Sequence, residues 1–239
     1  MQVFFDTIRP LFGGKLTQEQ VAGMQALLDA GRGLPVPHMA HVMAEVKRET
    51  GGGMYPIKET VFPHHKNKHP SDREVIRRLD AAWTKGQLPW VKSPYWRGGW
   101  FGRGQIQITH EANYRKAAEV TGVDLVAHPE RALELAVSAR IAVNGCASGM
   151  FTGKRLRDYD GAVYDHYNAR DIVNGDKGKR DKGAKVTVGE MIAADGRAFE
   201  AALSAAGWGI TPPPADYVAE PAPSSFWAVI VEIIRRLFK

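Results

Sequence analysis

The chain has 239 residues, of which 44% are hydrophobic and 24% are charged, a balance that excludes a disordered or collagen-like protein. Lysine and arginine outnumber aspartate and glutamate by 32 to 26, and the formal net charge of +6 favours an anionic partner: nucleic acid, an anionic membrane or an acidic cell-wall polymer. The single cysteine, Cys146, can form no intramolecular disulfide, which is typical of a reducing compartment. This length predicts one domain, or one domain with appendages.

The N-terminal segment does not resemble a secretion signal. Asp6 and Arg9 interrupt the apolar core that such a signal needs, and no small-residue cleavage site follows. No segment reaches the roughly 18 uninterrupted apolar residues of a membrane-spanning helix. We therefore expect a protein that is made in the cytoplasm without a classical signal peptide.

The spacing of apolar residues predicts a mainly α fold with little strand. A first helix is expected over residues 16–30, with Thr17 as its N-cap and Gln20 three residues later. A second is expected from Pro37 to the three glycines at 51–53. Further helical patterns cover residues 71–83, 112–121, 129–147 and 187–206.

Two segments interrupt this pattern. Residues 88–108 are rich in glycine, proline and aromatic side chains, which predicts a long loop, and long loops often carry function. After Gly209 the sequence TPPPADYVAEPAPSS predicts an extended linker. The expected organisation is a globular domain over residues 1–210, a proline-rich linker over 211–225 and a separate helix over 226–239.

The last fourteen residues, FWAVIVEIIRRLFK, predict a basic amphipathic helix. Glu232, Arg235, Arg236 and Lys239 recur at helical spacing, and apolar residues fill the rest of the wheel. This segment is too short to span a bilayer, and it suits the surface of an anionic membrane or lipopolysaccharide. The alternative is a terminal helix docked on the globular domain, which the proline-rich linker disfavours.

Glu49 is the first candidate for chemistry. It lies three residues after Val46 and seven after Val42, on the apolar stripe of the second predicted helix. Desolvation there would raise the pKa of its carboxyl group, as a general acid requires. The alternative is a structural carboxylate paired with Arg48. Glu45 lies further round the helix, where we expect a solvated side chain.

Glu59 follows ten residues later, beyond the glycine turn, in the sequence YPIKE. Two carboxyl groups facing one cleft are the minimal apparatus for glycoside hydrolysis, because one protonates the leaving oxygen while the other activates water. Spacing alone does not establish such a pair. The alternative is a surface ion pair of Glu59 with Lys58 or Lys66.

Aromatic residues crowd the loop before Gly102. Flat rings suit the apolar faces of sugars, so one or two of them could stack on a saccharide, while the others belong to the core. The residues concerned are Trp90, Tyr95, Trp96, Trp100 and Phe101.

Two clusters have bland interpretations. His64, His65 and His69 have no glutamate or cysteine at ligand spacing, so we expect a basic loop and no metal site. Residues 170–185 contain six basic and three acidic side chains but no interleaved aromatic residues. They predict a solvated loop and no nucleic-acid partner.

Three motifs occur in a characteristic order: KRETGGGMYPIKE at residues 47–59, GRGQIQITHEANY at 102–114 and RDIVNG at 170–175. Together they resemble the family 19 glycoside hydrolases, which comprise the plant-type chitinases and related bacteriophage endolysins. The resemblance implies a lysozyme-like two-lobed fold. It also implies inverting hydrolysis of a β-1,4 bond beside an N-acetylated sugar, without metal or cofactor.

The same resemblance assigns roles to individual positions. Glu49 matches the general acid, Glu59 the general base, and Thr109 the residue that helps to hold the attacking water. The expected substrate-binding residues are Gln107, Asn113, Tyr114, Asn174, Arg103 and Trp100. Arg48 stands where the family usually has histidine, and the span between Glu59 and the GRG motif differs, so Asp72 and Glu74 are the alternative bases.

The resulting functional prediction is an endolysin that cleaves the glycan strands of bacterial peptidoglycan and lyses the host cell. It would act as a monomer, in the periplasm, after release from the host cytoplasm through a holin. One alternative is a chitinase. Another is a cell-wall-binding or membrane-disrupting protein with impaired catalysis.

Overall fold

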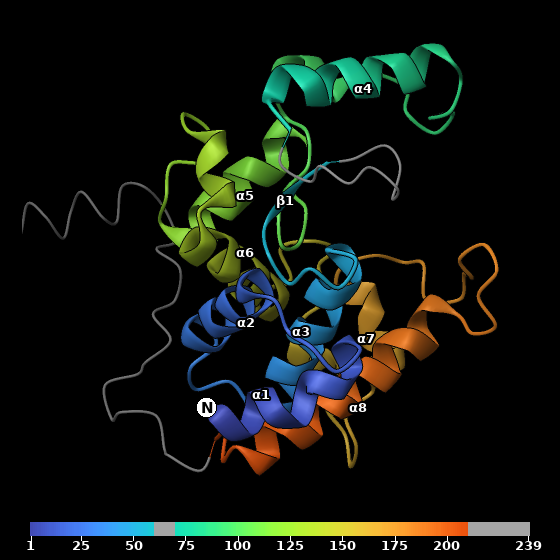
Figure 1. Cartoon of the computed structure of the whole chain (residues 1–239). Coiled ribbons are helices and arrows are strands. Elements are labelled where there is room, and N and C mark those ends of the chain that lie inside the picture. The colour runs from blue at the N-terminus through green and yellow to red at the C-terminus, as the bar shows by residue number, and fades with distance from the viewer. Residues whose placement is uncertain (60–69, 210–239) are drawn as a thin grey trace, which may run out of the picture.

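A computed structural model provides the structure of the protein and describes residues 1–59 and 70–209. Within these ranges the fold contains eight α-helices and a single two-stranded sheet (Figure 1). The predicted mainly α class is therefore confirmed. None of the described helices is long and apolar enough to cross a membrane. The predicted linker, the predicted terminal helix, Lys66 and the three histidines at 64, 65 and 69 lie outside the described residues.

In chain order, the helices of the described residues are α1 (Gln2–Ile8), α2 (Gln18–Ala30), α3 (Val36–Glu49), α4 (Asp72–Thr84), α5 (Glu111–Thr121), α6 (Leu135–Ser148), α7 (His166–Ala169) and α8 (Val188–Ala205). Strand β1 (Ile57–Lys58) pairs antiparallel with β2 (Arg103–Gly104). Short 3-10 helices cover Arg9–Phe12, Tyr95–Gly98, Pro129–Leu133, Leu156–Tyr159 and Arg170–Ile172.

Capping fixes the starts of the helices that the sequence predicts. The Thr17 hydroxyl accepts a hydrogen bond from the Gln20 amide at 3.1 Å, and the Gln20 side chain accepts one from the Thr17 amide at 2.8 Å. Ser71 and Thr187 cap α4 and α8 in the same position. Each cap satisfies backbone donors that the first turn leaves unpaired.

One predicted helix is wrong, and one helix of the structure was not predicted. Residues 129–147 do not form one helix, because Glu134 is extended at ψ 127° and separates a 3-10 turn from α6. Helix α1 was not expected at all, although it buries Phe4 and Ile8 against the main core. Seven residues are too few for a periodic pattern to identify a helix.

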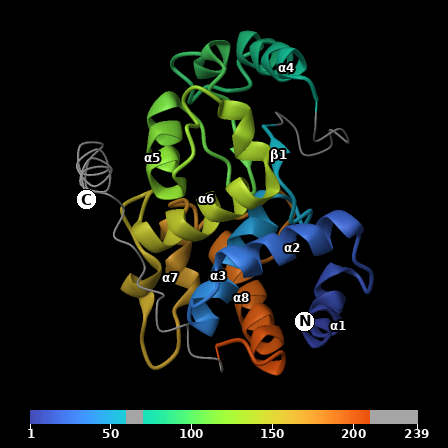
Figure 2. The same cartoon turned by 90° about the vertical axis from the view of Figure 1, so that its left-hand side faces the viewer.

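The core consists of three hydrophobic clusters. The largest is built mainly from α1, α2, α3, α6 and α8, with α3 packed along α8. A second joins α5 to α6, and a third joins α4 to Trp96 and Phe101. Figures 1 and 2 both place α4 at the end of the molecule opposite α1 and α8. The segment from α3 to β1 runs between these ends.

That segment is held by backbone contacts. The Gln105 side chain donates hydrogen bonds to the carbonyl oxygens of Met54, at 2.7 Å, and Gly23, at 3.3 Å. Gly23 in α2 lies so close that a Cβ atom there would be 1.9 Å from the Met54 oxygen. Thr50 also accepts a hydrogen bond from the Met54 amide at 2.8 Å. Residues 50–56 therefore have a fixed path.

Gly23→Ala tests this contact. The added methyl group would strike backbone atoms that cannot rotate away, so we expect the free energy of unfolding to fall by on the order of 2 kcal/mol despite alanine's higher helix propensity. Chemical denaturation measures the change. Gly178→Ala is the control, because a Cβ atom at Gly178 would meet nothing within 4 Å. Equal stability of the two variants would contradict the proposed close contact.

Candidate active site

Glu59 lies directly after β1 and is held by two donors. Its Oε1 accepts a hydrogen bond from the Tyr95 hydroxyl at 2.7 Å, and its Oε2 accepts one from the Gly102 amide at 2.8 Å. The Glu59 amide in turn donates to the Gly102 carbonyl at 2.7 Å. The first two of the three motifs therefore meet at Glu59.

Gly102 brings Gln107 to the same place. A Cβ atom on Gly102 would lie 2.6 Å from the Gln107 Oε1 and 3.2 Å from the Glu59 Cβ, so these two side chains flank the glycine closely. Gln107 is half-buried, and its Nε2 is 3.5 Å from the Ile57 carbonyl oxygen. Only glycine leaves room for both side chains at this turn.

Of the ion pairs and bases considered as alternatives to a catalytic Glu59, three can be located in the structure. Lys58 pairs with Asp72 at 2.6 Å and not with Glu59. Asp72 also pairs with Arg103 at 2.9 Å, and these hydrogen bonds from Lys58 and Arg103 outweigh the effect of burial and lower its pKa. Hydrogen bonds from Arg77 and Arg78 lower the pKa of Glu74 to about 2. Both alternative carboxylates are thus neutralised by neighbouring cations and poorly suited to accept a proton from water.

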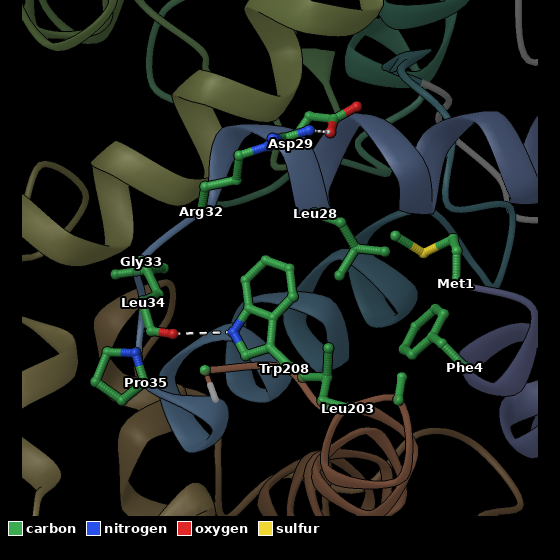
Figure 3. A pocket seen from close by; sticks show the side chains of 13 residues that line it. Met1, Phe4, Leu28, Asp29, Arg32, Gly33, Leu34, Pro35, Leu203 and Trp208 are labelled. Atoms are coloured by element: carbon green, nitrogen blue, oxygen red, sulfur yellow. Dashed lines mark hydrogen bonds and ion pairs between the residues drawn. The ribbon is translucent and has the colours of Figure 1, made fainter. Parts of the chain in front are cut away.

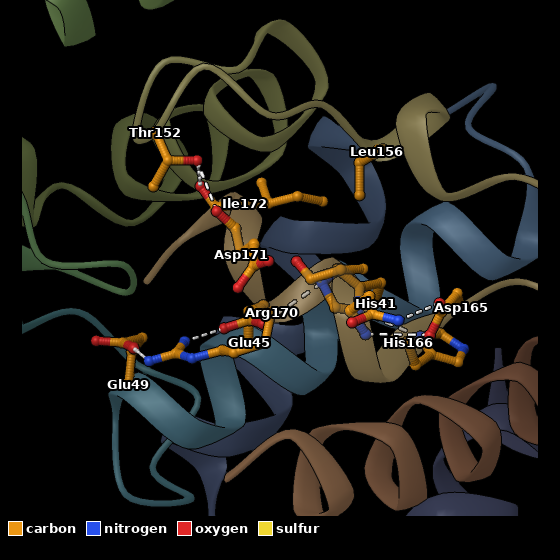
Figure 4. Close-up of polar contacts among 12 residues, drawn as sticks. His41, Glu45, Glu49, Thr152, Leu156, Asp165, His166, Arg170, Asp171 and Ile172 are labelled. Atoms are coloured by element: carbon orange, nitrogen blue, oxygen red, sulfur yellow. Dashed lines mark hydrogen bonds and ion pairs between the residues drawn. The ribbon is translucent and has the colours of Figure 1, made fainter. Parts of the chain in front are cut away.

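Glu49 is the last residue of α3 and keeps 22% of its side chain exposed. Its Oε1 lies 2.9 Å from the Arg170 Nη2 (Figure 4). Arg48, the partner considered from the sequence, instead pairs with Asp181, whose Oδ1 is 2.8 Å from the Arg48 Nη2. The guanidinium group that contacts the candidate acid therefore comes from the third motif and not from the adjacent residue.

Arg170 is 2% exposed and contacts three carboxylates: Glu45, Glu49 and Asp176. The expectation that residues 170–185 form a solvated loop is therefore wrong at its first position. The Asp176 Oδ1 is 2.8 Å from the Arg170 Nε. A buried guanidinium needs such compensation, because an unpaired charge away from water is strongly unfavourable.

The prediction of a solvated Glu45 is also wrong, because its side chain is fully buried. Helix α3 buries every residue from His38 to Val46, so its apolar stripe is much wider than the wheel suggested. Glu45 pairs with Arg170, and burial raises its pKa to about 8. Glu45 therefore carries a proton at neutral pH, which leaves Arg170 to balance Glu49 and Asp176.

A pair of histidines extends this polar network through the core (Figure 4). The His41 Nε2 lies 3.1 Å from the Ala169 carbonyl oxygen, and its Nδ1 lies 3.2 Å from the His166 Nδ1. The His166 Nε2 reaches Glu200 in α8 at 3.1 Å. Burial lowers the pKa of His41 to about 3, so this ring is neutral.

Sequence reasoning missed most of this network. Arg170 and Glu45 lie 125 residues apart in the sequence, and no local pattern joins them. One signal was present: Glu45 precedes Glu49 by four residues, and residues at that spacing share a helix face.

The remaining predicted site residues fall into two groups. Asn113, Thr109 and Asn174 lie at the surface or are half-buried. The Asn113 side chain donates to the Thr109 carbonyl at 2.8 Å, and the Asn174 amide donates to the Arg170 carbonyl at 3.0 Å. Asn174 therefore lies beside Arg170, the partner of Glu49, while Thr109 and Asn113 follow Gln107 in the chain.

Arg103 and Tyr114 do not fit the predicted role of substrate contacts, because they are 1% and 0% exposed. Arg103 donates to the Tyr114 hydroxyl at 2.8 Å, which in turn donates to the Phe101 carbonyl at 2.7 Å. Burial raises the pKa of Tyr114 to about 12. Both side chains hold the loop before β2. The Trp100 ring is half-buried against Tyr114, with 5.3 Å between centroids.

The aromatic residues of the loop differ in burial. Trp96 and Phe101 are buried in the core, whereas Trp90 is 73% exposed. Tyr95 is half-buried. A cavity of about 470 Å³ is lined by Trp90, Val91, Lys92, Ser93, Tyr95 and His110. Because Tyr95 also contacts Glu59, this cavity adjoins the candidate base.

A second cavity, of about 560 Å³, lies away from these carboxylates (Figure 3). Its walls come from α1, the turn between α2 and α3, and the end of α8. The Trp208 Nε1 donates to the Leu34 carbonyl at 2.9 Å, and Asp29 pairs with Arg32 at its rim. Its mostly apolar walls provide no candidate acid–base pair.

Comparison of the chain with protein-family models and with curated proteins finds no match. Among the described residues, no group of three or more histidine, cysteine, aspartate or glutamate side chains is arranged to hold a metal ion.

The raised pKa of Glu45 predicts a pH-dependent stability. The folded protein holds this proton up to about pH 8, whereas the unfolded chain releases it near 4.5, so the free energy of unfolding falls as pH rises between these values. His41 acts oppositely, but only up to about pH 6.5. As the pH rises from 6.5 to 8, the free energy of unfolding of the unmodified protein should therefore fall by at least about 1.4 kcal/mol more than that of Glu45→Gln.

Urea denaturation at a series of pH values measures this difference. The matched control is Glu119→Gln, since Glu119 is an exposed carboxylate on α5. Parallel stability curves for Glu45→Gln and the unmodified protein would show that Glu45 does not titrate in this range.

Proposed function

We propose that the protein is an endolysin that hydrolyses β-1,4 glycosidic bonds of bacterial peptidoglycan by an inverting acid–base mechanism. The observation that carries the proposal is the placement of Glu49 and Glu59. Both keep part of their surface exposed, both stand at the ends of one anchored segment, and each is oriented by partners distant in sequence. Such a pair of held carboxyl groups is what glycoside hydrolysis requires.

The proposal assigns a different role to each carboxylate. Glu59 accepts hydrogen bonds from the Tyr95 hydroxyl and the Gly102 amide, which fix the position from which it would activate water. Glu49 would donate the proton to the leaving oxygen, with Arg170 fixing its position. Thr109 would help to hold the water, and Gln107, Asn113 and Asn174 would contact sugar. A lysozyme-like, two-lobed arrangement of the chain belongs to the same proposal.

Chitin is the alternative substrate, because both polymers contain the N-acetylated sugar. The net charge of +6 and the basic segment 226–239 favour the anionic bacterial wall. A catalytically impaired binding protein is the other alternative. Arg48, which suggested it, is engaged by Asp181, but the Arg170 guanidinium lies 2.9 Å from Glu49 instead. We propose an active enzyme that works as a monomer, and the variants below test its activity.

Glu49→Gln and Glu59→Gln test the roles of the two carboxylates. Each substitution preserves side-chain volume and removes the acid or base, so we expect activity to fall on the order of 10² to 10⁴-fold. Release of reducing ends from purified peptidoglycan measures the loss, and circular dichroism checks the fold. Glu119→Gln, on the exposed face of α5, serves as the control.

Near-normal activity of a folded Glu49→Gln protein would rule out Glu49 as the acid. If only Glu59→Gln stayed active, Asp72→Asn and Glu74→Gln would be the next variants to measure. NMR of the first-formed product reports the mechanism, since inversion gives an α-configured reducing end from a β-linked substrate.

The segment 226–239 completes the proposal, although it lies outside the described residues. We propose that it binds an anionic membrane or lipopolysaccharide once the enzyme has been released from the host cytoplasm through a holin. Its apolar residues would supply buried area. Each of its cations would add on the order of 1 kcal/mol near an anionic surface.

Deletion of residues 212–239 should leave hydrolysis of purified peptidoglycan almost unchanged and sharply reduce binding to anionic vesicles. Changing Arg235, Arg236 and Lys239 to glutamine should weaken vesicle binding and make the remainder less sensitive to salt, while hydrolysis is spared. Vesicle co-sedimentation measures binding. Unfolding of the truncated protein, or unaltered vesicle binding, would instead favour a docked helix.

A further inference from the structure

The cavity beside Tyr95 has an aromatic wall and a basic rim. Trp90 exposes most of its indole, and the Tyr95 and His110 rings lie 4.4 Å apart at an angle of 51°. Lys92 and His110 are both exposed. The cavity thus combines flat apolar surface with nitrogen donors, and it is open to solvent where these groups lie.

The cavity is connected to the candidate base by one side chain. Tyr95 lines the cavity with its ring, and its hydroxyl donates to the Glu59 Oε1 at 2.7 Å. A group bound against the Tyr95 ring would therefore lie no further from the Glu59 carboxylate than about the length of one tyrosine side chain. Such a position belongs to the part of a substrate next to the bond being cleaved.

His110 occupies its place in an unfavourable backbone conformation. Its φ is +66° and its ψ is 141°, a region that residues other than glycine rarely adopt. The conformation is held by hydrogen bonds from the His110 amide to the Trp100 carbonyl, at 2.9 Å, and from the Asn113 amide to the His110 carbonyl, at 3.0 Å. It presents the imidazole to the cavity, where a glycine would relieve the strain and offer no ring.

The described residues that line the cavity include two basic side chains and no carboxylate. Within residues 1–59 and 70–209, no carboxylate forms an ion pair with Lys92 or His110, and the nearby Glu111 pairs with Arg115. Glu59 is not among the residues that line the cavity, and its two carboxylate oxygens accept hydrogen bonds from the Tyr95 hydroxyl and the Gly102 amide. The cavity therefore offers a free ammonium group and an imidazole to an anionic ligand.

We propose that this cavity binds the stem peptide of peptidoglycan and so selects peptidoglycan over chitin. The stem peptide carries free carboxylates that suit Lys92 and His110, together with short apolar side chains that suit Trp90 and Tyr95. Chitin is uncharged in its acetylated form and offers nothing to the basic rim. This inference rests on the proposed function, because it assigns a specificity to the same site.

The first experiment compares two forms of one polymer: intact peptidoglycan, and the same glycan after an amidase has removed the stem peptides. Lys92→Gln in the full chain should lower kcat/KM on the intact form about tenfold, the effect of one charge-assisted hydrogen bond, and on the stripped form by less than about twofold. Lys116→Gln is the matched control, because Lys116 is an exposed lysine on α5. The stripped glycan keeps the lactyl carboxylate that amidase cleavage exposes, so equal losses on both forms would mean that Lys92 contacts the glycan and not the peptide, and would overturn the inference.

The second experiment measures binding without catalysis. The soluble stem tetrapeptide is titrated into the full chain while NMR follows the Trp90 indole proton, and the titration is repeated with Lys92→Gln and His110→Gly. The expected result is a saturable shift that both substitutions weaken and Lys116→Gln does not. An unperturbed Trp90 signal would overturn the inference even if the enzyme cleaves peptidoglycan. A clear shift in a protein that cleaves neither substrate would instead refute only the proposed hydrolysis.

Discussion

The buried guanidinium group of Arg170 is the interaction on which the rest of the site depends. It joins α3, through Glu45 and Glu49, to Asp176 in the segment that follows α7. A cation with 2% exposure is tolerable only when carboxylates surround it, and removal of one partner leaves the others uncompensated. Because Glu49 is one of those partners, the position of the candidate acid is coupled to the folding of the core.

The second constraint is the short path between Glu49 and Glu59. Gly23 allows α2 to approach the Met54 carbonyl, and Gln105 bonds to that same oxygen from the segment after β2. The contact of Gly23 with the Met54 carbonyl is between main-chain atoms, which cannot change rotamer, so it fixes the path of the segment that joins Glu49 to Glu59. Gly102 then sets Glu59 beside Gln107 by leaving no atom between them.

Much of the helical architecture could be predicted because its signals are local. Thr17, Ser71 and Thr187 cap their helices with their immediate neighbours, and the apolar spacing in α3 and α8 spans only a few turns. Burial of Glu45 could not be predicted from a helical wheel, since it depends on which elements cover the opposite face of α3. The contact of Tyr95 with Glu59 is similarly hidden, because it joins residues 36 apart in the sequence.

The motifs themselves show where sequence reasoning stops. The motifs led to the prediction that Glu49, Glu59 and Gln107 belong to one site. Arg103 and Tyr114 lie in the same motif as Gln107, but they are buried. A motif contains both the residues that build a loop and the residues that the loop presents at the surface. Only their burial in the structure distinguishes the two groups. The strained backbone of His110 likewise could not be predicted from the residue types at positions 109–111.

The long separation between Glu45 and Arg170 has a consequence for biosynthesis. The two residues are 125 positions apart, so α3 leaves the ribosome well before the cation that compensates its carboxylates. Contacts of such high sequence separation form late, because the intervening chain must first be closed into a loop. During that interval Glu45 and Glu49 stand on a helix without the guanidinium group that they contact in the folded protein. The nascent chain therefore cannot complete its candidate site until Arg170 and the residues around it have been synthesised.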